Sequence, residues 1–162
     1  MGRLYGYVPL RFTAELTYAP NADGITEHRM ISLDRGSHFN RMTVWYDGIK
    51  KPVMLAAGVV LHSNDNLVLG RNYVQYADPT DNPQFHQSQV YVAVLFPEGV
   101  SETRLLEGDV NHGIGIVNNY QGAPYTYYFG SAWSQYDIRS QAQWQLTIDE
   151  FMARTPIKYT IQ

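Results

Sequence analysis

Residues 11–18 of the chain read RFTAELTY, and this stretch decides the fold class. Its apolar side chains fall at every second position: Phe12, Ala14, Leu16 and Tyr18. Successive side chains of a β-strand point to opposite faces, so this alternation predicts a strand with one buried face and one solvent-exposed face. The turn residues of segment 20–24 (PNADG) then end the strand.

Similar patterns recur along most of the chain. Further strands are expected over residues 25–33, 39–46, 53–62, 66–76, 89–96, 103–106, 113–117, 125–132 and 157–161. Within 39–46, the alternation places Arg41, Thr43 and Trp45 on the face opposite to Met42 and Val44. Residues 53–62 (VMLAAGVVLH) are apolar at nearly every position, which predicts a strand in the middle of a sandwich.

One amphipathic helix is expected near the C-terminus, over residues 141–153. Ser140 is a suitable N-cap and Gln143 follows three residues later, which is the pattern of a capping box. The apolar residues fall at helical spacing: Trp144, Ile148, Phe151 and Met152. Many strands followed by one helix predict an all-β protein, an antiparallel β-sandwich that forms a single domain over residues 1–162.

Composition excludes several classes of protein. Hydrophobic residues make up 44% of the chain and charged residues 17%, which is a globular balance. The net charge is −3, so the chain has no excess of positive charge that could bind a phosphate backbone. We therefore expect no nucleic-acid partner. No apolar run has the length of a membrane span, and no signal peptide is visible. The absence of cysteine excludes disulfides and thiolate metal sites.

Aromatic residues are abundant, with 13 tyrosines, 3 tryptophans and 6 phenylalanines. Aromatic rings pack well on a pleated sheet, and this structural role explains most of them. The apolar face of a sugar ring can also lie on an aromatic ring, while its hydroxyl groups bind polar side chains. The composition therefore fits carbohydrate recognition as well as core packing.

Four stretches in order along the chain resemble one bacterial family. They are ISLDRGSHFNRMTVWYDG (31–48), AAGVVLHSN (56–64), VNHGIGIV (110–117) and GAPYTYYFGSAWSQYD (122–137). From about Leu10 onward, the sequence is similar to the C-terminal part of the domain-of-unknown-function family numbered four-eight-six-one.

This resemblance implies a galactose-mutarotase-like β-supersandwich from a polysaccharide-degradation protein, in the periplasm or outside the cell. Members of the family are usually much longer. The resemblance therefore implies that the chain is a C-terminal portion and that the N-terminal half of the family fold is missing from it.

Histidines are the first candidates for chemistry. His112 lies between glycines in the sequence DVNHGIG, where Asp109 and Asn111 could orient its ring. An alternative role for His112 is to stabilise the turn by bonding to the backbone. His62 ends an apolar segment and is expected at the rim of a sheet.

A uronate lyase needs a base, a group that neutralises the substrate carboxylate, and an acid for the leaving oxygen. The candidate catalytic residues are His112, His62, Arg41 and Tyr128. The candidate substrate-binding residues are Trp133, Tyr120, Asn111 and Arg71. A mutarotase would instead pair a histidine with a carboxylate such as Asp109 or Glu107, and a hydrolase would need two paired carboxylates, which no spacing singles out.

We expect a carbohydrate-recognising domain that binds an oligosaccharide or polysaccharide and is lyase-like if it is an enzyme. A non-catalytic glycan-binding or structural module and a mutarotase-like or epimerase-like enzyme remain alternatives. No cofactor or metal site is expected. Calcium stays open because SNDN (63–66) and DPTDNP (78–83) contain oxygen ligands, although neither has the spacing of a known calcium loop.

Overall fold

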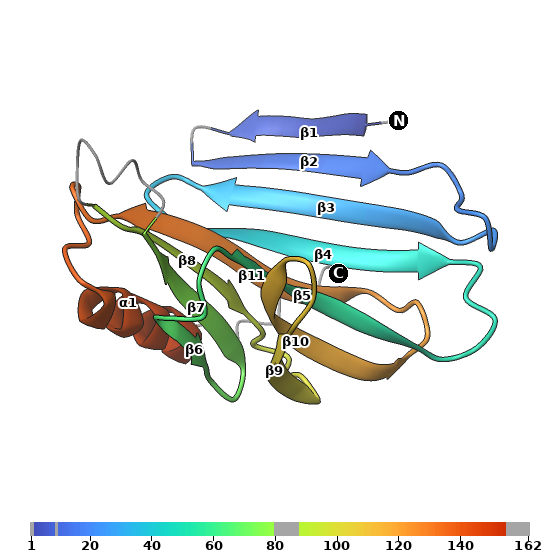
Figure 1. Cartoon of the computed structure of the whole chain (residues 1–162). Coiled ribbons are helices and arrows are strands. Elements are labelled where there is room, and N and C mark those ends of the chain that lie inside the picture. The colour runs from blue at the N-terminus through green and yellow to red at the C-terminus, as the bar shows by residue number, and fades with distance from the viewer. Residues whose placement is uncertain (1, 9, 80–87, 155–162) are drawn as a thin grey trace.

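The computed structural model describes residues 2–8, 10–79 and 88–154, without the side chains of 2–8. It contains a large and a small antiparallel sheet and one helix (Figure 1). The large sheet has the order β1-β2-β3-β4-β11-β8-β7-β6. Its strands are β1 (Gly2–Val8), β2 (Arg11–Thr17), β3 (Thr26–Asp34), β4 (Phe39–Asp47), β6 (Leu67–Leu69), β7 (Tyr73–Asp78), β8 (Val90–Leu95) and β11 (Tyr125–Trp133). The small sheet contains β5 (Val53–Leu61), β10 (Asn111–Tyr120) and β9 (Glu102–Leu106), in this order. The predicted all-β sandwich is confirmed.

The small sheet packs on one face of β7, β8 and β11. Val74, Val94 and Phe96 of this layer are buried and contact Ala57 and Val59 of β5. The two sheets approach closely because β10 carries glycines at the contact. A β-carbon added to Gly115 would lie 2.4 Å from a ring carbon of Phe96, so a larger residue could not occupy this position without movement.

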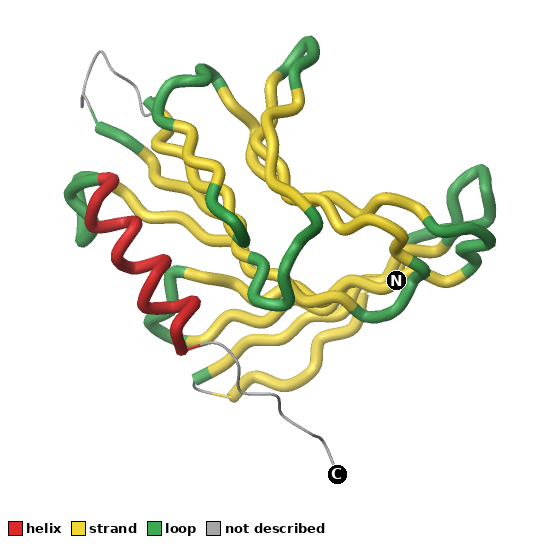
Figure 2. The backbone as a smooth tube through the Cα atoms, turned by 90° about the horizontal axis from the view of Figure 1, so that it is seen from below, coloured by secondary structure: helices red, strands yellow, loops and turns green. Residues whose placement is uncertain are grey.

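The helix α1 (Gln141–Arg154) packs on the other face of the same strands, as Figure 2 shows. Its apolar stripe is buried, with Trp144 and Ile148 at 0% exposure against a core that includes Leu95 of β8. The N-cap is confirmed, because the backbone N–H of Gln143 donates to Oγ of Ser140 at 3.2 Å. The strands β7 and β8 are therefore buried on both faces.

The small sheet does not cover the strands β1 to β3 (Figure 1). The alternation predicted for 11–18 is present, and register places Phe12 beside Leu33 on the face that carries the small sheet elsewhere. These two side chains are nevertheless 41% and 39% exposed. The sandwich is thus covered over only part of its large sheet.

Two predictions about strands are wrong. The single strand expected over 66–76 is divided into β6 and β7, because the chain turns at Gly70, whose N–H donates to the carbonyl of Tyr73. The strand expected in the middle of a sandwich is β5, which lies at the edge of the small sheet with Met54 68% exposed and Val60 49% exposed. An unbroken apolar run does not show how many neighbours a strand has.

The predicted helix near the C-terminus is present as α1. The helix begins at the predicted residue and ends at Arg154, while the strand predicted over 157–161 lies outside the described residues. Within the described part of the chain, no helix combines the length and the apolar character that crossing a membrane requires.

Candidate functional site

Four polar side chains line up across four neighbouring strands of the large sheet. Register pairs Thr13 with Ser32, Ser32 with Arg41, and Arg41 with Tyr128. Directly paired residues of adjacent strands point to the same face. Tyr128 contacts Phe151 of α1, with ring centroids 4.9 Å apart. These four residues, which we call the polar row, therefore lie on the face that carries the helix.

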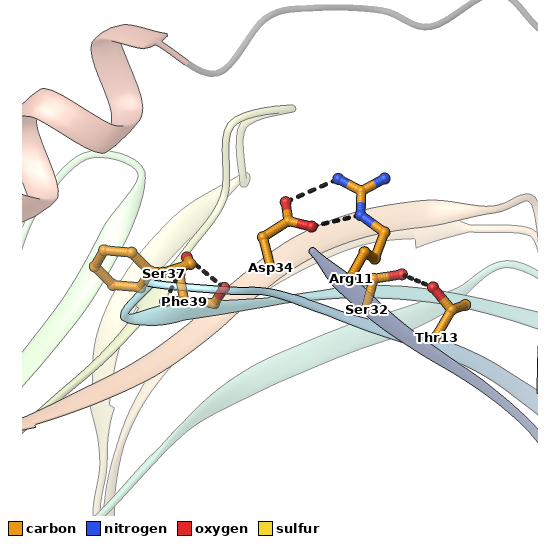
Figure 3. A network of polar contacts seen from close by, with 6 residues as sticks. All are labelled: Arg11, Thr13, Ser32, Asp34, Ser37 and Phe39. Atoms are coloured by element: carbon orange, nitrogen blue, oxygen red, sulfur yellow. Dashed lines mark hydrogen bonds and ion pairs between the residues drawn. The ribbon is translucent and has the colours of Figure 1, made fainter. Parts of the chain in front are cut away.

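An ion pair borders the polar row (Figure 3). Nε and Nη2 of Arg11 bind the two carboxylate oxygens of Asp34 at 2.5 and 2.8 Å. The hydrogen bond from Arg11 lowers the pKa of Asp34. Beside this pair, the hydroxyl groups of Thr13 and Ser32 are hydrogen-bonded at 3.1 Å. Each charge of the pair is balanced by the other, so this end of the row is close to neutral.

Arg41 is the unbalanced charge of the polar row. It is exposed, and among the residues that the structure describes no carboxylate pairs with it. Its neighbour Tyr128 has a raised pKa, chiefly because the phenol is partly buried, although Arg41 and Arg11 oppose this shift. The Tyr128 hydroxyl is therefore protonated at neutral pH and can donate a hydrogen bond or a proton.

The same face continues along the strands away from the helix. Thr43 and Thr126 share a hydrogen bond of 2.9 Å. Beyond them the rings of His28 and Trp45 are stacked, with centroids 5.0 Å apart and planes 5° apart. Nε2 of His28 lies 3.0 Å from Asp47. The alternation within 39–46 predicted Trp45 on the face of Arg41. No sequence signal pointed to His28, because only the register of β3 and β4 brings His28 to Trp45.

A second feature lies on the other face of the large sheet, where segments 61–64 and 108–111 line a hollow of about 440 Å³. Here Nδ1 of His62 lies 2.9 Å from the carboxylate of Asp78. The amide of Asn111 donates to Oδ1 of Asn64 at 3.0 Å and accepts from the N–H of Gly108 at 3.2 Å. The predicted residues His62 and Asn111 are thus brought together.

His112 does not share this hollow. It pairs with Val60 and Leu106 inside the small sheet, and its neighbours Asn111 and Gly113 point to the opposite face. The orientation of its ring by Asn111 was expected, but the structure gives Asn111 other partners. We therefore do not include His112 in the candidate sites below.

The remaining predicted binding residues lie apart from one another. Tyr120 is 7% exposed and donates its hydroxyl proton to the carbonyl of Ala123 at 2.7 Å. Trp133, at the end of β11, is 43% exposed, and its Nε1 donates to Ser88 at 3.3 Å. Arg71 lies in the turn before β7, at the opposite end of this strand from Asp78. Tyr120 is therefore buried in the core, while Trp133 and Arg71 lie outside both groups.

The predicted residues consequently fall into two groups on opposite faces of one sheet. Arg41 and Tyr128 lie in the polar row, whereas His62 and Asn111 line the hollow. Over residues 2–8, 10–79 and 88–154, no group of three or more His, Cys, Asp or Glu side chains could hold a metal ion. The DPTDNP segment lies partly outside these ranges.

The sequence of the chain matches a known protein family. The model of the family described as "Domain of unknown function (DUF4861)" matches residues 4–161. The chain belongs to this family. The predicted resemblance is therefore confirmed.

One curated relative shows how this DUF4861 domain relates to longer proteins. The chain is 27% identical to "Uncharacterized protein P7" of Formosa agariphila over 166 aligned residues. The alignment covers 95% of this chain but 40% of that protein. The DUF4861 domain described here thus spans well under half the length of this relative.

Proposed function

We propose that the domain binds an acidic oligosaccharide, one that contains uronate units, across the polar row. The observation that carries the proposal is Arg41, an exposed guanidinium without a described carboxylate partner, next to the neutral phenol of Tyr128. A guanidinium binds a carboxylate through two parallel hydrogen bonds, which makes arginine suited to this group. The unbalanced charge favours an anionic over a neutral ligand.

The surroundings of Arg41 support a sugar in particular. Thr13 and Ser32 present hydroxyl groups that can exchange hydrogen bonds with those of a sugar. The stacked rings of His28 and Trp45 lie on the same face, four residues along β3 and β4 from the row. This separation is roughly 13 Å at the rise of a strand. An extended ligand could therefore contact Arg41 and Trp45 at the same time, with the aromatic ring under an apolar sugar face.

Lyase chemistry would use the same two residues. Arg41 would offset the negative charge of a paired uronate carboxylate, which stabilises the anion formed when the proton on the adjacent ring carbon is removed. Tyr128, protonated at neutral pH, would supply a proton to the leaving oxygen. A base is also required, and it would have to come from outside the polar row.

Binding without turnover is the second candidate, and the position of the histidines favours it. His62, a predicted base, reaches Asp78 on the opposite face of the sheet. His28 is on the correct face but four residues along the strand from the row. His38 lies three residues before Arg41, but its Nε2 is 3.2 Å from Asp137 and its ring contacts Trp144. None of these three histidines stands in register with Arg41 and Tyr128.

Titration calorimetry with oligogalacturonate tests the proposal. Arg41→Gln should weaken binding at least tenfold, whereas the control Arg71→Gln, at an exposed position away from the row, should bind as the parent does. Absorbance of the unsaturated product reports turnover in the same samples. Binding without a rise in absorbance would favour the second candidate, and absence of binding by the folded protein would refute the proposal.

The proposed function also leads to an expectation about the cellular location of the protein. A domain that binds polysaccharide fragments is expected where such polymers occur, in the periplasm or outside the cell. Fractionation of a producing cell, followed by detection of the full-length protein, tests this expectation. Recovery in the cytoplasmic fraction alone would contradict it.

A further inference from the structure

We propose that the hollow between segments 61–64 and 108–111 is a second binding site, which takes an uncharged sugar unit through neighbouring hydroxyl groups. It lies on the other face of the large sheet from the polar row and uses none of its residues. The inference therefore stands independently of the function proposed above. Three properties of the hollow support a sugar-binding site: walls that are fixed by hydrogen bonds, a histidine whose ring is oriented, and acidic residues around the hollow.

The walls of the hollow are held by bonds within the protein. Asn111 bridges both segments, since its amide N–H donates to Asn64 and its oxygen accepts from the N–H of Gly108. On the other side, the N–H of Ser63 donates to the hydroxyl of Tyr76 at 3.1 Å. Tyr76 is 1% exposed and thus part of the core. A ligand would meet groups that are already positioned, which reduces the entropy cost of binding.

His62 has one nitrogen anchored and the other available. The carboxylate of Asp78 has no proton to give when ionised, so Nδ1 of His62 must be the donor in their 2.9 Å contact. In a neutral imidazole this contact places the proton on Nδ1 and leaves the lone pair on Nε2. The side chain of Asp78 is 13% exposed and that of His62 is 57% exposed. The mostly buried carboxylate of Asp78 thus holds the ring of the exposed His62, whose Nε2 can accept a hydrogen bond from a sugar hydroxyl.

The charges around the hollow select an uncharged ligand. Asp109 contributes a carboxylate to the lining, and Asp65 and Glu107 adjoin it. The sequences 61–66 (LHSNDN) and 107–112 (EGDVNH) contain no lysine or arginine. A carboxylate accepts hydrogen bonds from two neighbouring hydroxyl groups, while it repels a uronate or a sulfate. The hollow and the polar row would therefore bind ligands of different charge.

Nuclear magnetic resonance titration of the ¹⁵N-labelled protein tests this second site. The probes are the methyl glycosides of galactose, rhamnose and xylose, with galacturonate as the charged comparison. At least one neutral glycoside should shift the amide signals of Asn64, Gly108 and Asn111 in a saturable way. Galacturonate should bind there at least tenfold more weakly.

Variants separate this site from the polar row. Asp109→Asn and His62→Ala should each weaken the neutral glycoside at least fivefold, while the exposed control Asp23→Asn and the row variant Arg41→Gln should leave it unchanged. The conservative Asp109→Asn keeps the test valid if His62→Ala lowers the melting temperature. Absence of shifts with all three glycosides would overturn the inference, as would shifts that survive both variants or that Arg41→Gln abolishes. Failure of oligogalacturonate to bind would refute only the function proposed for the polar row.

Discussion

Trp144 of α1 stacks on Phe39 of β4, with ring centroids 5.1 Å apart and planes 24° apart. Phe39 precedes Arg41 by two residues on the same strand, so this contact holds the helix at one end of the polar row. Phe151, two turns later in the helix, contacts Tyr128 of the row itself. The helix is therefore both a cover for the core and a wall of the candidate site.

Trp144→Ala should destabilise the domain by about 3–5 kcal/mol, because it removes a large side chain with 0% exposure from a packed core. The matched control is Leu146→Ala in the same helix, at a position that is 62% exposed. The control should change the free energy of unfolding by about 0.5 kcal/mol or less. Denaturation in urea measures both values, and equal effects of the two variants would contradict the packing described for α1.

Gly115→Ala tests the close approach of the two sheets. Its new methyl group would lie 2.4 Å from the ring of Phe96, so the small sheet would have to move. We expect a loss of about 1–3 kcal/mol in the free energy of unfolding, as overpacking typically costs. Gly108→Ala is the control, since its methyl group would meet nothing closer than 3.8 Å. A Gly115→Ala variant as stable as the parent would show that the sheets are less tightly packed.

Stability should fall at alkaline pH. Burial raises the pKa of Tyr46 to about 12 and that of Tyr120 to about 12, from an ordinary value of 10.0. Above pH 10 the unfolded chain therefore holds fewer protons than the folded protein, and the free energy of unfolding decreases with pH. Melting temperatures should show no contribution from these phenols below about pH 9 and a decline from pH 10 to 12. Tyr120→Phe should reduce the decline, and an unchanged slope in this variant would contradict the assignment.

The apolar face of β2 and β3 should bind a hydrophobic dye. Phe12 and Leu33 are neighbours on this face and about two-fifths exposed. Phe12→Ser combined with Leu33→Ser should lower the fluorescence of the dye 8-anilinonaphthalene-1-sulfonate with a small change in melting temperature. The exposed pair Met54 and Val60 of β5, changed to serine, is the comparison. Equal dye fluorescence in the parent and in the Phe12/Leu33 variant would show that this face does not bind it.

The strands were predictable because each leaves a local signal. Residues 11–18 alternate, and one face of β4 carries Arg41 and Trp45 in agreement with the period of two. The position of a strand within a sheet leaves no such signal, which is why β5 was placed in the middle of a sandwich. The number of neighbours depends on segments far away in the chain.

The candidate sites were predictable residue by residue but not as groups. Arg41 and Tyr128 are 87 positions apart in sequence, and only the pairing of β4 with β11 makes them neighbours. Conversely, His112 is adjacent to Asn111 in sequence, yet a strand sends their side chains to opposite faces. Asp78, which anchors His62, is the last residue of β7, two residues beyond the end of the strand predicted over 66–76.

In the proposed function Arg41 binds a carboxylate of the ligand, and a thermodynamic cycle tests this contact. Calorimetry would compare the parent protein and Arg41→Gln, each with oligogalacturonate and with its methyl ester of the same length. We expect Arg41→Gln to weaken binding of the acid by about 10- to 150-fold, which corresponds to the roughly 1.5–3 kcal/mol of a charged hydrogen bond. The methyl ester should bind both proteins with similar, weak affinity. Equal losses for the acid and the ester, or no loss for the acid, would contradict the claim.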